Sequence, residues 1–79
     1  LELIEGRKID WNRPSDVGEA YIINETLARR LDFAVPIGEK IPGYGNRIIV
    51  GVIKDFHFNP LHSSIGPMAI SHRNRHYNN

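Results

Sequence analysis

The sequence contains no cysteine, so disulfides, zinc–thiolate sites and thiol catalysis are all excluded for its 79 residues. No apolar run approaches the roughly 18 to 20 residues that cross a bilayer. The opening stretch, Leu1 to Gly6, also lacks the basic and long apolar parts of a signal peptide. The net charge is only +1, and the aromatic residues are not interleaved with a dense basic stripe. This composition argues against nucleic-acid binding.

The residues that are present are typical of a soluble globular chain. Hydrophobic residues make up 41% and charged residues 24%, which argues against disorder of the whole. A chain of 79 residues forms one domain and buries a small core, so we expect modest stability. We predict a single subdomain over residues 1–70, excised from a larger protein, and a flexible polar tail over residues 71–79.

A central strand is predicted at residues 47–55. Ile48 to Ile53 is almost entirely β-branched, and turn residues bound it, which favours a strand covered on both faces. Strict alternation would place Ile48, Val50 and Val52 on one face and Ile49, Gly51 and Ile53 on the other. Gly51 marks a bend or the close approach of a neighbouring element.

One short helix is predicted at residues 25–32. Asn24 is a good N-cap residue, and Leu27 and Leu31 share the face that would pack on the sheet. Before it, the sequence predicts a short strand at Leu1–Ile4 stopped by Gly6, a loop over residues 7–18 and a strand at Ala20–Ile23. After it come a short strand at Glu39–Ile41, a loose hairpin into the central strand and an edge strand at Met68–Ile70. The expected fold class is α+β, with a small, mainly antiparallel sheet of about three to five strands.

The predicted loop over residues 7–18 contains the only tryptophan, Trp11, and two interpretations stay open for it. The ring anchors the loop to the body of the domain, or it is exposed and contacts a partner. We take Trp11 and the neighbouring Arg13 as the candidate partner-contact residues.

The histidines raise the alternative of a small-ligand or metal-binding domain that uses Asp55, His57 and His62. His72 and His76 have the i, i+4 spacing of a helical metal pair, but the tail around them has no apolar periodicity. A catalytic pair of Asp55 and His57 would need a nucleophile, and no G-x-S-x-G motif is present. We therefore predict no catalytic, cofactor-binding or metal-binding residues and no enzymatic activity.

Several short motifs follow one another in an order that resembles a known family. They are Leu3-Ile4-Glu5-Gly6-Arg7, Ser15-Asp16, Ile22-Ile23-Asn24-Glu25-Thr26-Leu27-Ala28-Arg29-Arg30-Leu31, Pro36-Ile37-Gly38, Ile49-Val50-Gly51-Val52-Ile53-Lys54-Asp55-Phe56-His57-Phe58 and Leu61-His62. Together they resemble the periplasmic core domain of the MacB-like and FtsX-like permeases of ABC transporters, in the form found in Bacteroidetes-type bacteria. The likeness extends from about Leu1 to Pro67. Glu39 departs from it, because the family often has a basic residue directly after the Pro-Ile-Gly turn.

The resemblance implies a non-catalytic, inserted lobe of an extracytoplasmic domain, on the periplasmic face of the bacterial inner membrane. Such a lobe couples the motion of the transporter to periplasmic partners or substrate. The implied partners are the rest of the same permease chain, an ABC ATPase subunit that acts through the full-length protein, and a periplasmic partner protein. The fragment itself would not span the membrane. The family offers no shared catalytic or cofactor-binding residues to carry over.

Overall fold

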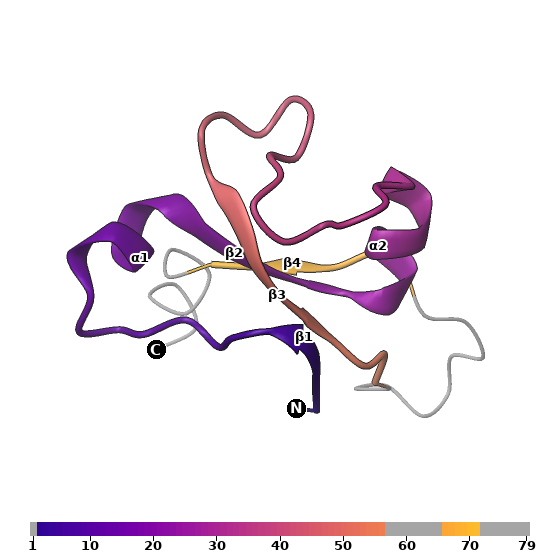
Figure 1. Cartoon of the computed structure of the whole chain (residues 1–79), viewed down its shortest axis with the longest axis horizontal. Coiled ribbons are helices and arrows are strands. Elements are labelled where there is room, and N and C mark those ends of the chain that lie inside the picture. The colour runs from indigo at the N-terminus through magenta and orange to yellow at the C-terminus, as the bar shows by residue number, and fades with distance from the viewer. Residues whose placement is uncertain (1, 57–65, 72–79) are drawn as a thin grey trace.

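The structure is a computed structural model and describes residues 2–56 and 66–71. Within these residues the chain forms an α+β fold of four strands and two helices (Figure 1). In chain order the elements are β1 (Leu3–Gly6), α1 (Pro14–Glu19), β2 (Ala20–Asn24), α2 (Glu25–Leu31), β3 (Ile48–Ile53) and β4 (Ala69–Ile70). Neither helix in the described part of the chain is long and apolar enough to cross a membrane.

The four strands form one mixed sheet in the order β1-β3-β2-β4. β1 pairs with β3 and β4 pairs with β2 in antiparallel fashion, whereas β2 and β3 are parallel. β3 is therefore an inner strand and β4 an edge strand, as predicted, but the sheet is mixed and not purely antiparallel. The parallel pair follows from the connection, because the chain between β2 and β3 crosses over through α2 instead of turning back directly.

The predicted strand at Glu39–Ile41 is present only as one isolated bridge. Lys40 pairs with Ile48 in antiparallel fashion. The backbone N–H of Ile49 donates to the carbonyl of Glu39 at 2.8 Å, and that of Gly38 donates to the carbonyl of Ile49 at 2.8 Å. The chain thus enters β3 through an antiparallel contact, which is the loose hairpin that the turn residues indicate.

The strict alternation predicted for β3 is wrong, because β3 has a bulge. Tyr21 of β2 pairs with Ile49, while the next residue, Ile22, pairs with Gly51, so Val50 is the extra residue. As a result, Ile49 and Val52 pack in one cluster, and Val50 packs in the other with Ile53.

The two clusters form the core. The first cluster contains Ile9, Ala20, Ile22, Val50 and Ile53, with Leu3, Trp11, Phe56 and Ile70 packed against it. The second cluster contains Ile23, Ile41, Ile49 and Val52, with Tyr21, Leu27, Ala28, Leu31, Ile37 and Ala69 packed against it. Because successive residues of β2 alternate between the clusters, they lie on opposite faces of the sheet. The segment before α1 covers the first face, and α2 with the chain after it covers the second.

Helix α2 confirms the prediction closely. The side chain of Asn24 accepts a hydrogen bond from the backbone N–H of Leu27, which is the expected N-cap. The helix ends at Leu31, and Asp32 adopts the left-handed conformation with φ of 56° that commonly terminates helices. Leu27 and Leu31 pack on the second cluster, as the spacing predicts.

Helix α1 was not predicted, because residues 7–18 have the composition of a loop. Pro14 occupies its first turn, a position that suits proline, but the N-cap residue, Arg13, makes no side-chain cap hydrogen bond. A helix of 6 residues is not stable alone. Its stability must come from contacts with distant residues, described below.

Gly51 lies where the chain after β1 crosses β3 closely. A Cβ atom there would collide with the backbone carbonyl of Arg7, which explains the glycine that the sequence marks as a close approach. At the other end of the chain, Ser71 is 1% exposed, so this first residue of the predicted tail belongs to the folded body. The rest of the predicted tail, 72–79, lies outside the described residues.

Candidate functional site

An ion pair braces the segment that carries the two candidate contact residues. Nη1 of Arg7 lies 2.5 Å from Oδ2 of Asp16, and Nη2 lies 2.8 Å from Oδ1. Oδ2 of Asp16 also accepts a hydrogen bond from the backbone N–H of Asp10 at 2.8 Å. The guanidinium therefore binds the carboxylate in the bidentate geometry, which is the strongest arginine–carboxylate contact. It ties the end of β1, the loop and α1 together.

The electrostatics of the pair follow from its burial and its hydrogen bonds. Asp16 is only 2% exposed, and burial alone would raise its pKa. The hydrogen bonds from the Arg7 guanidinium outweigh burial, and with the backbone N–H of Asp10 they lower the pKa of Asp16 to about 2. The same contact raises the pKa of Arg7. Both groups are therefore charged at neutral pH.

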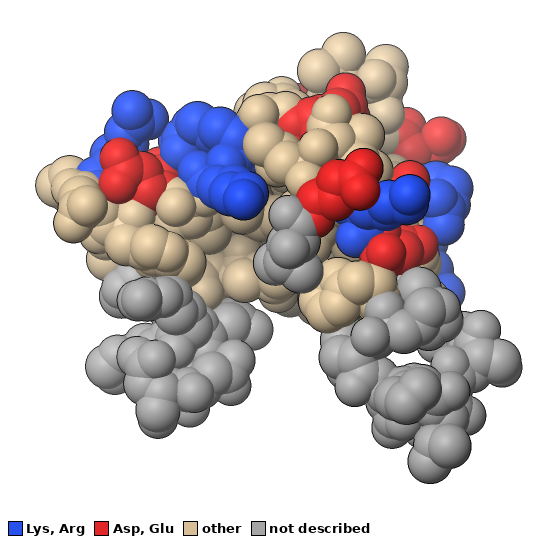
Figure 2. Space-filling view, turned by 90° about the horizontal axis from the view of Figure 1, so that it is seen from below, with Lys and Arg blue, Asp and Glu red and all other residues tan. Residues whose placement is uncertain are grey.

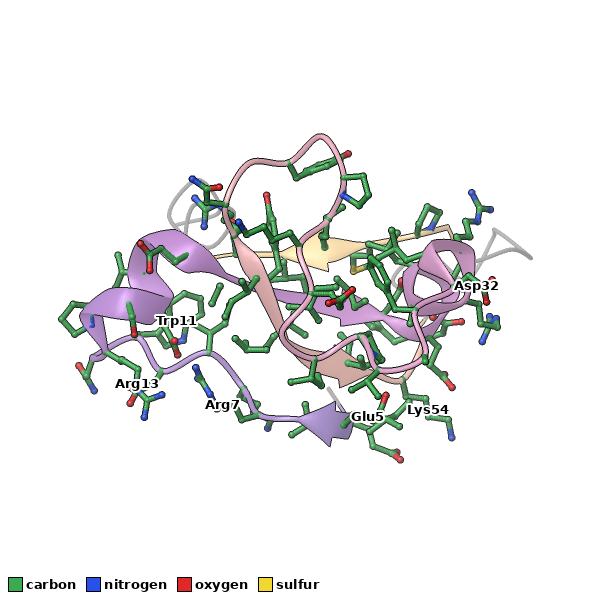
Figure 3. The ribbon with its side chains drawn as sticks, turned by 45° about the horizontal axis from the view of Figure 1, so that its top comes forward. Glu5, Arg7, Trp11, Arg13, Asp32 and Lys54 are labelled. Carbon is green, nitrogen blue, oxygen red and sulfur yellow. The ribbon has the colours of Figure 1, made fainter. Side chains whose placement is uncertain are left out.

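Trp11 and Arg13 lie at the α1 end of the molecule together with Arg7 (Figure 3). Trp11 is partly buried and packs against the first cluster, which is the anchoring interpretation of its ring. Arg13 is exposed, and its carbonyl accepts hydrogen bonds from the backbone N–H groups of Asp16 and Val17. Trp11 thus fixes the segment to the sheet, whereas the Arg13 side chain faces solvent. Whether either contacts a partner stays a prediction.

The charges on the face that Figure 2 shows do not form a field of one sign. Basic and acidic side chains lie next to each other at both ends of this face (Figure 2). This agrees with the net charge of +1. A partner docking here would be selected by individual charged contacts and shape more than by a long-range field.

A second polar cluster lies where β2 and β3 end. The Asp55 carboxylate accepts hydrogen bonds from the backbone N–H of Thr26 at 3.1 Å and from its hydroxyl at 2.8 Å, and it lies 3.5 Å from Arg29. The backbone N–H of Asp55 in turn donates to Glu25 at 3.1 Å. The Thr26 hydroxyl is the main cause that lowers the pKa of Asp55, with smaller contributions from the Thr26 backbone and Arg29. Asp55 therefore secures the first turn of α2 to the end of β3.

These contacts bear on the alternative of a metal or ligand site at Asp55, His57 and His62. Asp55 holds Thr26 and Arg29 and would have to release them to coordinate an ion. His57 and His62 lie outside the described residues, as do His72 and His76. Among residues 2–56 and 66–71, no group of three or more acidic or histidine side chains is close enough to hold a metal. The metal alternative stays a prediction.

Replacing Thr26 by Val tests this description of Asp55. Removing the hydroxyl should raise the pKa of Asp55 toward its ordinary value, because that hydroxyl is the main cause of the shift. Carboxyl ¹³C chemical shifts followed against pH would measure it. Arg29→Gln is the matched control and should raise the pKa by less, since Arg29 is exposed and 3.5 Å away. An equal or larger effect of Arg29→Gln would show that charge, not the hydroxyl, governs Asp55.

The sequence missed the Arg7–Asp16 pair, although both residues occur in the motifs that resemble the permease family. Nine positions separate them, which matches no helix or strand spacing. The one local signal is Pro14 two residues before an acidic residue, a pattern that favours a helix start.

Comparison with protein-family models, with curated proteins and with solved structures finds no match to this chain.

Proposed function

We propose that this chain is a non-catalytic, extracytoplasmic subdomain of an ABC transporter permease of the MacB-like and FtsX-like kind. It acts at the periplasmic face of the bacterial inner membrane, as part of a longer permease chain whose ATPase subunit works on the other side. Its role is to pass transporter motion to a periplasmic partner or substrate. The segment over residues 7–19 is the docking element.

The observation that supports the proposal is the hydrogen bonding of the buried Asp16 carboxylate, which braces the segment over residues 7–19. Asp16 is a buried carboxylate held by two hydrogen bonds from Arg7 and one from Asp10. This arrangement ties a short helix, with the exposed Arg13 at its N-cap, to the chain after β1. The resemblance of the motifs to the permease family supplies the rest, and Arg7 and Asp16 both occur in those motifs.

A rigid surface segment suits mechanical coupling. Force applied to Arg13 or α1 reaches β1 through the Arg7–Asp16 pair and reaches the first cluster through Trp11. Since packed cores move as discrete bodies and do not deform continuously, the segment and sheet would move together. The lobe would thus work as a lever and not by bond chemistry.

Reversing the charge at Arg13 tests the docking element. In the full permease reconstituted with its ATPase and periplasmic partner, Arg13→Glu should weaken partner binding about fivefold, roughly 1 kcal/mol. Folding should change by less than about 0.5 kcal/mol, because the side chain is exposed. Arg30→Glu on the exposed side of α2 is the matched control and should leave binding unchanged. Equal binding by wild type and Arg13→Glu would remove this role.

Trp11→Ala is a less selective test, because its ring packs on the first cluster. We expect a loss of about 1–2 kcal/mol of folding stability from a partly buried tryptophan, together with weaker partner binding. Thermal unfolding of the isolated chain measures the first effect. A large loss of stability with unaltered binding would show that Trp11 is an anchor only.

The placement of the chain in a permease is tested separately. The natural reading frame is expected to encode membrane helices on both sides of this stretch, with an ATPase gene nearby. Because the stretch has no cysteine, Arg13→Cys introduces a single thiol into it. A membrane-impermeant maleimide should label that thiol in spheroplasts before lysis. Labelling only after lysis, or a reading frame without membrane helices, would overturn the proposal.

A further inference from the structure

Arg47 and two tyrosines form a cluster on the face of the sheet opposite Trp11. The Arg47 guanidinium carbon lies 5.3 Å from the centroid of the Tyr21 ring, which is within cation–π range. Tyr44 meets the same ring edge-on, with 6.4 Å between centroids and an interplanar angle of 78°. Tyr44 is 59% exposed, whereas Tyr21 packs against the second cluster. The Tyr21 ring therefore contacts the guanidinium on one side and the Tyr44 ring on another.

One N–H donor group of the Arg47 guanidinium lacks a hydrogen-bond acceptor among the described residues. Its Nη1 atom is buried and has no hydrogen-bond partner in the part of the chain that the structure describes. No carboxylate of the described residues forms a salt bridge with Arg47. An unpaired buried donor on a charged group lowers stability and is rare in native proteins, so it indicates an acceptor that residues 2–56 and 66–71 do not supply. Arg47 as a whole is only partly buried, so an anion can approach its exposed part from solvent, although Nη1 itself has no exposed surface.

Tyr44 also lines an apolar hollow. It has a volume of about 140 Å³ and is lined by Leu27, Ile41, Tyr44, Pro67 and Ala69. An apolar cavity of about 150 Å³ accommodates one benzene-sized group. The hollow therefore suits one branched aliphatic side chain and is too small for a long alkyl chain. Tyr44 borders both the hollow and the Arg47–Tyr21 pair.

We propose that this cluster binds the carboxyl terminus of a peptide or protein whose last side chain is apolar. The terminal carboxylate pairs with the Arg47 guanidinium, while the last side chain enters the hollow beside Tyr44. The last residue of a chain carries both the carboxylate and the apolar side chain. This matches a site in which Tyr44 borders both the Arg47–Tyr21 pair and the hollow. The site lies on the second face, away from Trp11 and Arg13, and does not depend on the permease assignment.

N-acetyl-leucine is a small probe with both features, and N-acetyl-leucinamide is its counterpart without the charge. Titrations of the ¹⁵N-labelled chain should show saturable amide shifts at Tyr21, Tyr44 and Arg47 with the acid. The expected dissociation constant is in the millimolar range for a ligand of this size. The amide should bind at least about tenfold more weakly, since it lacks the charged acceptor. This comparison needs no variant and cannot be confused with a folding defect.

Arg47→Met keeps the aliphatic packing on Tyr21 and should abolish preference for the acid over the amide. Arg30→Met removes an exposed charge from α2 and should leave it unchanged. If Arg47→Met unfolds, Tyr44→Ala tests the same site and should weaken binding of both probes. Equal binding of acid and amide, or shifts that Arg47→Met does not alter, would overturn the proposal. Tighter binding of octanoate than of N-acetyl-leucine would indicate a fatty acid and would also contradict it.

Discussion

Replacing Asn24 by Ala should destabilise the chain by about 3–4 kcal/mol, because three hydrogen bonds depend on one buried amide. Its Oδ1 accepts from the backbone N–H groups of Leu27 and Met68, each at 3.0 Å, and its Nδ2 donates to the carbonyl of Gly66 at 2.9 Å. Asn24 is 0% exposed, so water does not readily replace these partners. A domain of this length has a total stability of about 4–12 kcal/mol. Urea unfolding followed by circular dichroism would measure the loss.

Asn24→Ser separates the two roles of this side chain. Serine keeps the N-cap bond to Leu27 but is too short to hold both Met68 and Gly66, so we expect an intermediate loss of about 2 kcal/mol. Asn12→Ala, at an exposed position, is the matched control and should change stability by less than about 0.5 kcal/mol. If Asn24→Ser cost nothing, the link to Gly66 and Met68 would contribute nothing, and if Asn24→Ala cost no more than Asn24→Ser, the cap bond to Leu27 would contribute nothing.

Asn24 also shows how far the sequence alone could go. The N-cap role follows from local spacing, because the capping asparagine and its target in α2 are three residues apart. The contacts with Gly66 and Met68 span 42 and 44 positions, and no local pattern indicates them. The same division holds for β3. Its β-branched composition predicts a buried strand, but the bulge at Val50 depends on how β2 aligns with it.

The candidate site was harder to predict than the fold. The sequence singled out Trp11 and Arg13 from their residue types, and it assigned their surroundings to a loop. Helix α1 forms because Asp16 meets Arg7 across the loop, so its cause lies outside its own six residues. Arg47 was missed because an unpaired donor becomes visible only when every neighbouring acceptor has been placed.

Replacing Asp16 by Asn should cost about 2 kcal/mol at neutral pH and progressively less in acid. The folded protein lowers the pKa of Asp16 from 3.8 to about 2, so the unfolded chain takes up the proton first as the pH falls. The contribution of the charge is therefore complete above about pH 5 and is lost as the pH falls through about 2. Because Arg7 is 43% exposed, solvent screens the pair, and we expect about 1–2 kcal/mol of the difference to depend on pH.

Urea unfolding of wild type and Asp16→Asn at pH 7, 4 and 2.5 would measure this dependence. Asp32→Asn is the control, since it removes an exposed carboxylate at the end of α2 and should change stability at pH 7 by less than about 0.5 kcal/mol. Hydrogen exchange should show that Asp16→Asn loosens residues 7–19 while β3 stays protected, because the pair braces only that segment. In the permease that we propose for this chain, the same variant is expected to weaken partner docking although Arg13 is intact. A stability difference that is identical at pH 7 and pH 2.5 would show that the ionised carboxylate does not brace residues 7–19.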